Sequence, residues 1–186
     1  MTRHEKDFLN HNYYDRPGPG ARAQELAVST NVVDYANLGT LNLEASYGFD
    51  RHWTVNAGLK YNPFAFDKGE DMKMNKQRSV SAGARFWPWH IYSGWWLSGG
   101  LRAQEYSYGG FQSPQTSEGD RYGGSLGGGY TYMIADHLNV DFGVGVWAGY
   151  DVYKTYACQT CGASLDKGEK YFLLPADITV ALTYVF

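Results

Sequence analysis

The 186-residue sequence has little concentrated charge and no long apolar run. Its 16 lysines and arginines are scattered and the formal net charge is −3, so nucleic acid is not expected as a partner. No run approaches the roughly 20 apolar residues that a membrane helix requires. The first 24 residues have no apolar segment typical of a secretion signal, so either the chain is cytoplasmic or its signal has been removed.

Glycine and aromatic residues are abundant instead. The chain contains 23 glycines, 16 tyrosines and 6 tryptophans. Glycine and aromatic residues at this level favour an all-β protein with tight turns. The length favours a single domain.

Apolar residues alternate with polar or small residues in eight segments of the sequence. At the C-terminus the alternation from Leu174 to Phe186 has a period of two without a slip, which predicts a strand with one apolar face. The first segment shows the weakest pattern. The eight segments are residues 25–35, 41–49, 53–61, 79–87, 95–104, 122–132, 138–150 and 174–186.

The connections between these segments fall into two classes. Residues 49–52, 88–94 and 134–137 are short turns, and residues 62–77, 108–121 and 152–170 are long and polar. Strands of about ten residues are long enough to cross a bilayer at a tilt, and turns of alternating length are typical of outer-membrane barrels. We therefore predict an all-β, eight-stranded antiparallel up-and-down transmembrane β-barrel over residues 25–186, with residues 1–24 as a periplasmic tail.

Alternation alone also fits a soluble lipocalin-like barrel, whose apolar face points inward. An eight-stranded barrel has little room inside, and the bulky residues here crowd one face while glycine and serine occupy the other. The bulky face is therefore predicted to point outward. The few charges on the small-residue face are predicted to form a network in the lumen: Glu44, Lys60, Arg85, Arg102, Asp141 and Asp177.

Aromatic residues lie near both ends of the predicted strands. Such residues form girdles at the two membrane interfaces of known barrels. The girdle near the short turns is predicted to contain Phe49, Trp53, Trp87, Trp95, Tyr132 and Phe186. The girdle near the long loops is predicted to contain Tyr61, Tyr106, Tyr122, Tyr150 and Phe172.

Two stretches resemble known proteins. The terminal "LTYVF" resembles the C-terminal signal that the outer-membrane assembly machinery reads. The sequence from "SAGARFWPW" through "DRYGGSLGGGYTYMIADHLNVDFGVGVWAGYDVYKTYACQTC" to the last strand resembles a family of uncharacterised Gram-negative outer-membrane β-barrels, over about residues 26–186. The predicted architecture is also similar to that of outer-membrane proteins A and X. The resemblance implies an outer-membrane location, a removed signal peptide, and contact with the bilayer and lipopolysaccharide, but it supplies no catalytic residues.

Few residues suggest chemistry. His4 and His11 lie in the tail, and His52, His90 and His137 lie in short turns, where polar turn residues are expected. Cys158 and Cys161 have CxxC spacing in a polar loop, for which we prefer a disulfide; free thiols and metal or redox chemistry stay open. No cofactor, metal site or catalytic residue is predicted.

The predicted function is a structural or interaction role in the outer membrane. The lumen is expected to be plugged by side chains, and the long loops are expected to bind other outer-membrane or periplasmic proteins, for example as an accessory subunit of an envelope complex. A lipid-modifying outer-membrane enzyme and a soluble ligand-binding barrel are the alternatives.

Overall fold

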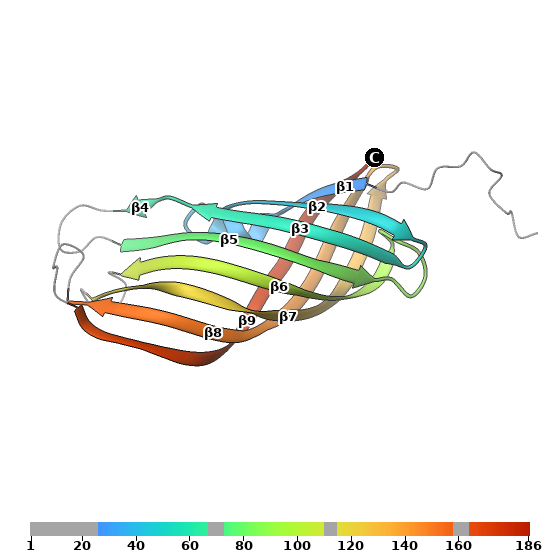
Figure 1. The fold of residues 1–186 in the computed structure, drawn as a ribbon. Helices are drawn as coiled ribbons and strands as arrows, with labels where there is room; N and C mark the ends of the chain where they lie inside the picture. Colours follow the sequence, from blue (N-terminus) through green and yellow to red (C-terminus); the bar gives the residue numbers. More distant parts are fainter. Residues whose placement is uncertain (1–25, 67–72, 110–114, 158–163) are drawn as a thin grey trace, which may run out of the picture.

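The computed structural model describes residues 26–66, 73–109, 115–157 and 164–186 (Figure 1). Within these ranges the chain forms nine strands and one short helix. The elements are β1 (Leu26–Asn31), α1 (Val32–Ala36), β2 (Leu41–Asp50), β3 (Trp53–Asn62), β4 (Ala65–Phe66), β5 (Lys73–Phe86), β6 (Gly94–Gly109), β7 (Thr116–Ala135), β8 (Leu138–Tyr156) and β9 (Ser164–Val185).

Eight of these strands form a closed antiparallel barrel. Each long strand pairs with the next long strand along the chain, and β1 pairs with β9 to close the sheet. The short strand β4 pairs only with the end of β5 and is an additional ninth strand. The predicted all-β, eight-stranded, up-and-down antiparallel barrel is therefore confirmed.

The strands on one side are much longer than expected. β7, β8 and β9 contain 20, 19 and 22 residues, and they project beyond their neighbours in Figure 1. The prediction that residues 108–121 and 152–170 are loops was therefore largely wrong. Tyr156 donates a hydrogen bond to Glu118 across the β7–β8 pair. Such cross-strand pairs stabilise this part of the sheet. Because both of its faces are polar, the sequence there shows no alternation of apolar residues.

The first predicted segment is not one continuous strand. β1 ends at Asn31, whose side chain accepts a hydrogen bond from the backbone N–H of Val33 and donates one to the carbonyl of Ile178. These two bonds cap α1 and fix the end of β1 against β9. The helical turn then directs Asp34 toward the interior, where it meets Lys60.

The last strand contains a register shift. Val144 pairs with Ile178 but Val146 pairs with Pro175, so one extra residue of β9 lies between the two pairs. Proline has no N–H for the ladder, which favours an irregularity at this point. The expectation of an unbroken period of two was therefore wrong, and Ala176 lines an interior cavity instead of sharing the outward face of Ile178.

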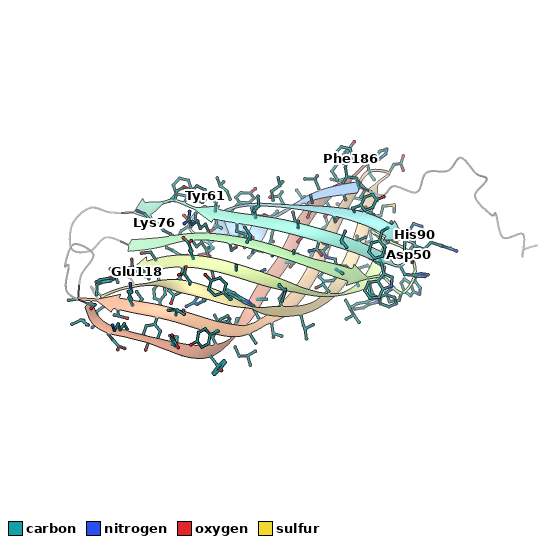
Figure 2. All side chains as sticks on the ribbon, in the orientation of Figure 1. Asp50, Tyr61, Lys76, His90, Glu118 and Phe186 are labelled. Atoms are coloured by element: carbon teal, nitrogen blue, oxygen red, sulfur yellow. The ribbon has the colours of Figure 1, made fainter. Side chains whose placement is uncertain are left out.

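The bulky aliphatic side chains in the middle of the strands point away from the barrel interior. The exposed fraction is 73% for Leu101 and 67% for Val144, both near the middle of their strands. In Figure 2, Asp50, His90 and Phe186 lie at the end with the short turns, and Tyr61, Lys76 and Glu118 lie at the end with the long hairpins. No helix in the described ranges has the length and apolar character needed to cross a membrane.

Candidate functional site

The interior of the barrel contains a central cluster of charges. Arg85 of β5 places Nη2 2.6 Å from Glu44 Oε1 and Nη1 3.7 Å from Asp141 Oδ2. Asp141 is 2% exposed and also accepts hydrogen bonds from the hydroxyls of Thr131 and Thr183. Both charge signs are therefore compensated inside the barrel, which such burial requires.

Two other predicted lumen cations have different partners. Lys60 Nζ lies 2.8 Å from Asp34 Oδ2 of α1. Arg102 Nη1 donates to the carbonyl oxygen of Ala176 at 3.3 Å, and its guanidinium lies 5.4 Å from the centre of the Trp147 ring. The side chain of Asp177 lies outside the described part of the structure. Sequence reasoning missed Asp34, because residues 32–35 read as part of a strand.

A second interior cluster lies closer to the long hairpins. Asp151 is fully buried, accepts a 2.8 Å hydrogen bond from the Tyr106 hydroxyl, and lies 3.2 Å from Arg121 Nε. Lys170 Nζ is 3.8 Å from the same carboxylate. Burial, and then the hydrogen bond to Asp151, raise the pKa of Tyr106 well above its ordinary value.

The sequence contains a signal for two residues of this second cluster. Arg121 and Asp151 each continue the inward alternation by one step beyond Gly123 and Gly149. The predicted strands end there, because the polar residues that follow are typical of loops. Extending the period of two would have placed both charges inside the barrel.

Aromatic rings stack on the interior cations. The guanidinium of Arg85 lies 4.7 Å from the centre of the Trp96 ring, and that of Arg121 lies 3.9 Å from the centre of the Tyr106 ring. Arg85 Nε and Trp96 Nε1 have no hydrogen-bond partner within the described ranges, and both residues border an interior cavity of about 100 Å³. A cavity of this size can hold a few water molecules, which such N–H groups can bind.

Three predicted girdle residues point into the barrel, so their assignment was wrong. Trp87 is 1% exposed and donates from Nε1 to Thr54 Oγ1 at 3.2 Å. Tyr106 is 6% exposed and binds the interior carboxylate described above. Phe172 packs edge-on against Trp147 at a centroid distance of 4.7 Å.

The reason differs among these three residues. Trp87 lies two positions after Arg85, and Tyr106 lies four positions after Arg102, so both have the inward parity of their strands. Phe172 precedes the register shift in β9, which exchanges the two faces. The other predicted girdle residues lie on the outward face: Phe49, Trp53, Trp95, Tyr132 and Phe186 near the short turns, and Tyr61, Tyr122 and Tyr150 near the long hairpins.

The turn between β5 and β6 fills the barrel mouth at the short-turn end. Ile91 and Tyr92 are 5% and 6% exposed, and the Tyr92 hydroxyl donates to the carbonyl of Ser46 at 3.2 Å. Asn139 Nδ2 donates to the Tyr92 carbonyl at 2.9 Å, which fixes the turn against β8. Together with Trp87, this turn closes the described interior at this end.

A groove of about 600 Å³ lies at the opposite end, on the outside of the barrel. Its charged lining side chains come from β5, β6, β7 and β8. Arg78 and Glu105 form an ion pair across it at 2.5 Å, and this contact lowers the pKa of Glu105. The charged lining residues are Lys76, Arg78, Glu105, Glu118, Asp120 and Lys154.

The described histidines lie at the short-turn end. His90 and His137 contact the backbone carbonyls of Ile91 and Val185 through Nδ1, at 3.0 and 2.8 Å. His52 Nδ1 is 3.8 Å from Asp50 Oδ1. In the part of the chain that the structure describes, no three metal-ligating side chains come together. The remaining predicted residues, His4, His11, Cys158 and Cys161, fall outside the described ranges.

A protein-family model matches residues 17–186, which is most of the chain. The family is described as "Protein of unknown function (DUF3575)". This match confirms the expected relation to a family of unknown function. The chain matches no curated protein and no solved structure.

Proposed function

The chain belongs to this family of proteins of unknown function, DUF3575, and we propose that it is an integral β-barrel of the Gram-negative outer membrane with a structural or interaction role. The observation that carries the proposal is the apolar outer surface of the barrel. Bulky aliphatic side chains from all the long strands are exposed there: Leu43, Leu59, Val80, Leu101, Leu126, Val144, Ile178 and Leu182.

A continuous apolar surface of this kind is unfavourable in water. Monomeric soluble proteins rarely expose apolar patches larger than a few hundred Å², and a soluble barrel turns its bulky face inward. In this barrel the inward face instead carries glycines and paired charges such as Arg85 with Glu44. Hydrocarbon around the barrel is the environment that suits both faces.

The height of the apolar surface also supports the proposal. On β8 the outward side chains are apolar or aromatic from Leu138 to Tyr150, and Lys154 is the first charged one beyond them. Twelve steps along a strand tilted by about 40° give a height of roughly 30 Å. This height is close to the thickness of a bilayer's hydrocarbon core. We call this outward surface the apolar band.

The interior and the long hairpins support an anchoring or binding role. The interior is occupied by ion pairs and aromatic rings, and the turn around Tyr92 fills one mouth. β7, β8 and β9 project beyond the apolar band and end in polar segments. Projecting hairpins on a rigid barrel are a suitable platform for contact with another molecule, so we place them outside the cell and the short turns in the periplasm.

Folding with and without a membrane mimic tests the location. We expect denatured protein diluted from urea to form a β-rich barrel in detergent micelles or lipid vesicles, and to aggregate in plain buffer. The membrane fractions of expressing cells should contain the protein in the outer membrane. A monodisperse, β-rich protein in plain buffer would refute the membrane proposal.

A shortened hairpin tests the interaction role. In this variant residues 153–168 are replaced by a two-residue Asn-Gly turn between Val152 and Glu169. These two residues already face each other across β8 and β9. We expect the barrel to fold normally but to lose a partner that co-purifies with the full-length barrel in mild detergent. Identical co-purified proteins for both forms would contradict a role for the projecting hairpin.

A further inference from the structure

We propose that the outward groove beside the apolar band binds the phosphorylated sugar head group of a glycolipid in the outer leaflet. This inference rests on the proposed membrane location and names the molecule that the outer rim of the barrel contacts. The groove has a volume of about 600 Å³ and is open on the outer surface.

The groove is built from two rows of outward side chains that run across neighbouring strands. In the first row each residue faces the next across the ladder: Tyr61, Arg78, Glu105, Asp120 and Val152. The second row lies two residues farther along each strand and contains Lys76, Ser107, Glu118 and Lys154. All nine residues line the groove.

The position of the two rows matches the head-group region. On β8 the first row follows Tyr150 by two residues, and on β6 it follows Ala103 by two residues. Ala103 is the last outward apolar side chain on β6, and on β8 the first row is Val152 itself, after which Lys154 is the first charged outward side chain. At about 3.4 Å per residue the rows lie roughly 7 and 14 Å along the strands beyond the apolar band. Lipid head groups are therefore the nearest external molecules.

The groove contains three cations and three carboxylates, and Glu118 lies opposite Lys154 in the ladder. Arg78 is paired with Glu105, and Asp120 also acts on Arg78 by raising its pKa. Glu118 accepts a hydrogen bond from Tyr156. Lys76 and Lys154 are exposed and form no ion pair with any residue that the structure describes.

The two lysines stand at opposite ends of the second row. Three strand steps separate them, which corresponds to roughly 14 Å between their backbones. A disaccharide with a phosphate at each end can span this distance. The sugar would lie over Ser107, whose hydroxyl can hydrogen-bond to it, and each phosphate would meet one ammonium group.

The test compares two lipids and four proteins in detergent. The lipids are lipid A with both phosphates and the same lipid after enzymatic dephosphorylation. The proteins are the wild type, Lys76→Gln, Lys154→Gln and the double variant, with native mass spectrometry or a fluorescence titration as the readout. Arg51→Gln is the matched control, because it removes one exposed cation from the turn at the opposite end of the barrel.

We expect the wild type and Arg51→Gln to bind the phosphorylated lipid equally well and to prefer it over the dephosphorylated form. Each lysine variant should weaken this binding about fivefold, and the double variant about thirtyfold, as expected for cations at an anionic membrane surface. Equal binding of the two lipids by the wild type, or an unchanged affinity in the double variant, would overturn the inference.

The folding experiment separates this inference from the proposed function. A barrel that folds only with detergent but does not distinguish the two lipids refutes the groove assignment alone. A barrel that folds in plain buffer and still prefers the phosphorylated lipid refutes the membrane location and supports the groove. Circular dichroism of each variant verifies that its barrel is folded before the affinity is measured.

Discussion

Val144 and Val152 provide a matched test of the membrane location. Both valines lie on β8 and point outward, and Val152 is eight positions after Val144. Val144 is at the middle of the apolar band and is 67% exposed, whereas Val152 lies just beyond Tyr150 in the outer groove. The same substitution, Val→Arg, therefore changes β-propensity and size equally but places the charge at two different depths.

The expected costs follow from those depths. Val144 is six strand steps from each edge of the band, so its arginine would lie roughly 15 Å from either interface. Arginine on the lipid face of a barrel costs about 2–4 kcal/mol at the midplane and about 0–1 kcal/mol near the interface. Val144→Arg should therefore lower the folding equilibrium constant about 30- to 1000-fold, and Val152→Arg less than about sixfold.

The assay is reversible unfolding by denaturant in lipid vesicles, followed by tryptophan fluorescence. In water both positions would be exposed, and surface substitutions would change stability by about 0.5 kcal/mol or less. Equal and small losses for the two variants would therefore contradict the membrane location. A loss that is larger for Val152→Arg than for Val144→Arg would contradict the assigned depth of the band.

Three further substitutions test the interior under the same conditions, and a fourth, Gly124→Ala, is an outward control. Arg85→Met should cost about 3–5 kcal/mol, because it leaves the buried Asp141 without its cation; a cost below 1 kcal/mol would argue against the central cluster. Gly123→Ala should cost about 1–3 kcal/mol, because the added Cβ would lie 2.1 Å from a backbone carbonyl oxygen of β8. Gly124→Ala, with its nearest atom at 3.8 Å, should be tolerated, and equal effects of the two alanines would contradict the assigned faces. Tyr106→Phe should cost about 1.5–3 kcal/mol by removing a hydrogen bond to a buried carboxylate, and an unchanged unfolding midpoint would show that this bond contributes nothing.

The strand pattern could be predicted wherever one face is apolar. Between Leu138 and Tyr150 every second residue is apolar, and the structure forms the expected strand with these residues outward and Trp147 on the inward face. The pattern failed where both faces are polar, because the period of two then leaves no hydrophobic signal. Asp151 and Arg121 lie just past that limit, and their buried pairing was missed.

Local sequence therefore determined which side chains share a face, because the side chains of a strand alternate, and it placed the glycines and the charges of the apolar-alternating segments on the inward face. The tertiary structure decided what depends on register and on contacts between distant strands. The shift at Pro175 exchanges the faces of β9 and turns Phe172 inward. Closure of the barrel brings Glu44, Arg85 and Asp141 from three strands to one point, because these contacts depend on how non-adjacent strands face each other across the lumen, which no local pattern encodes.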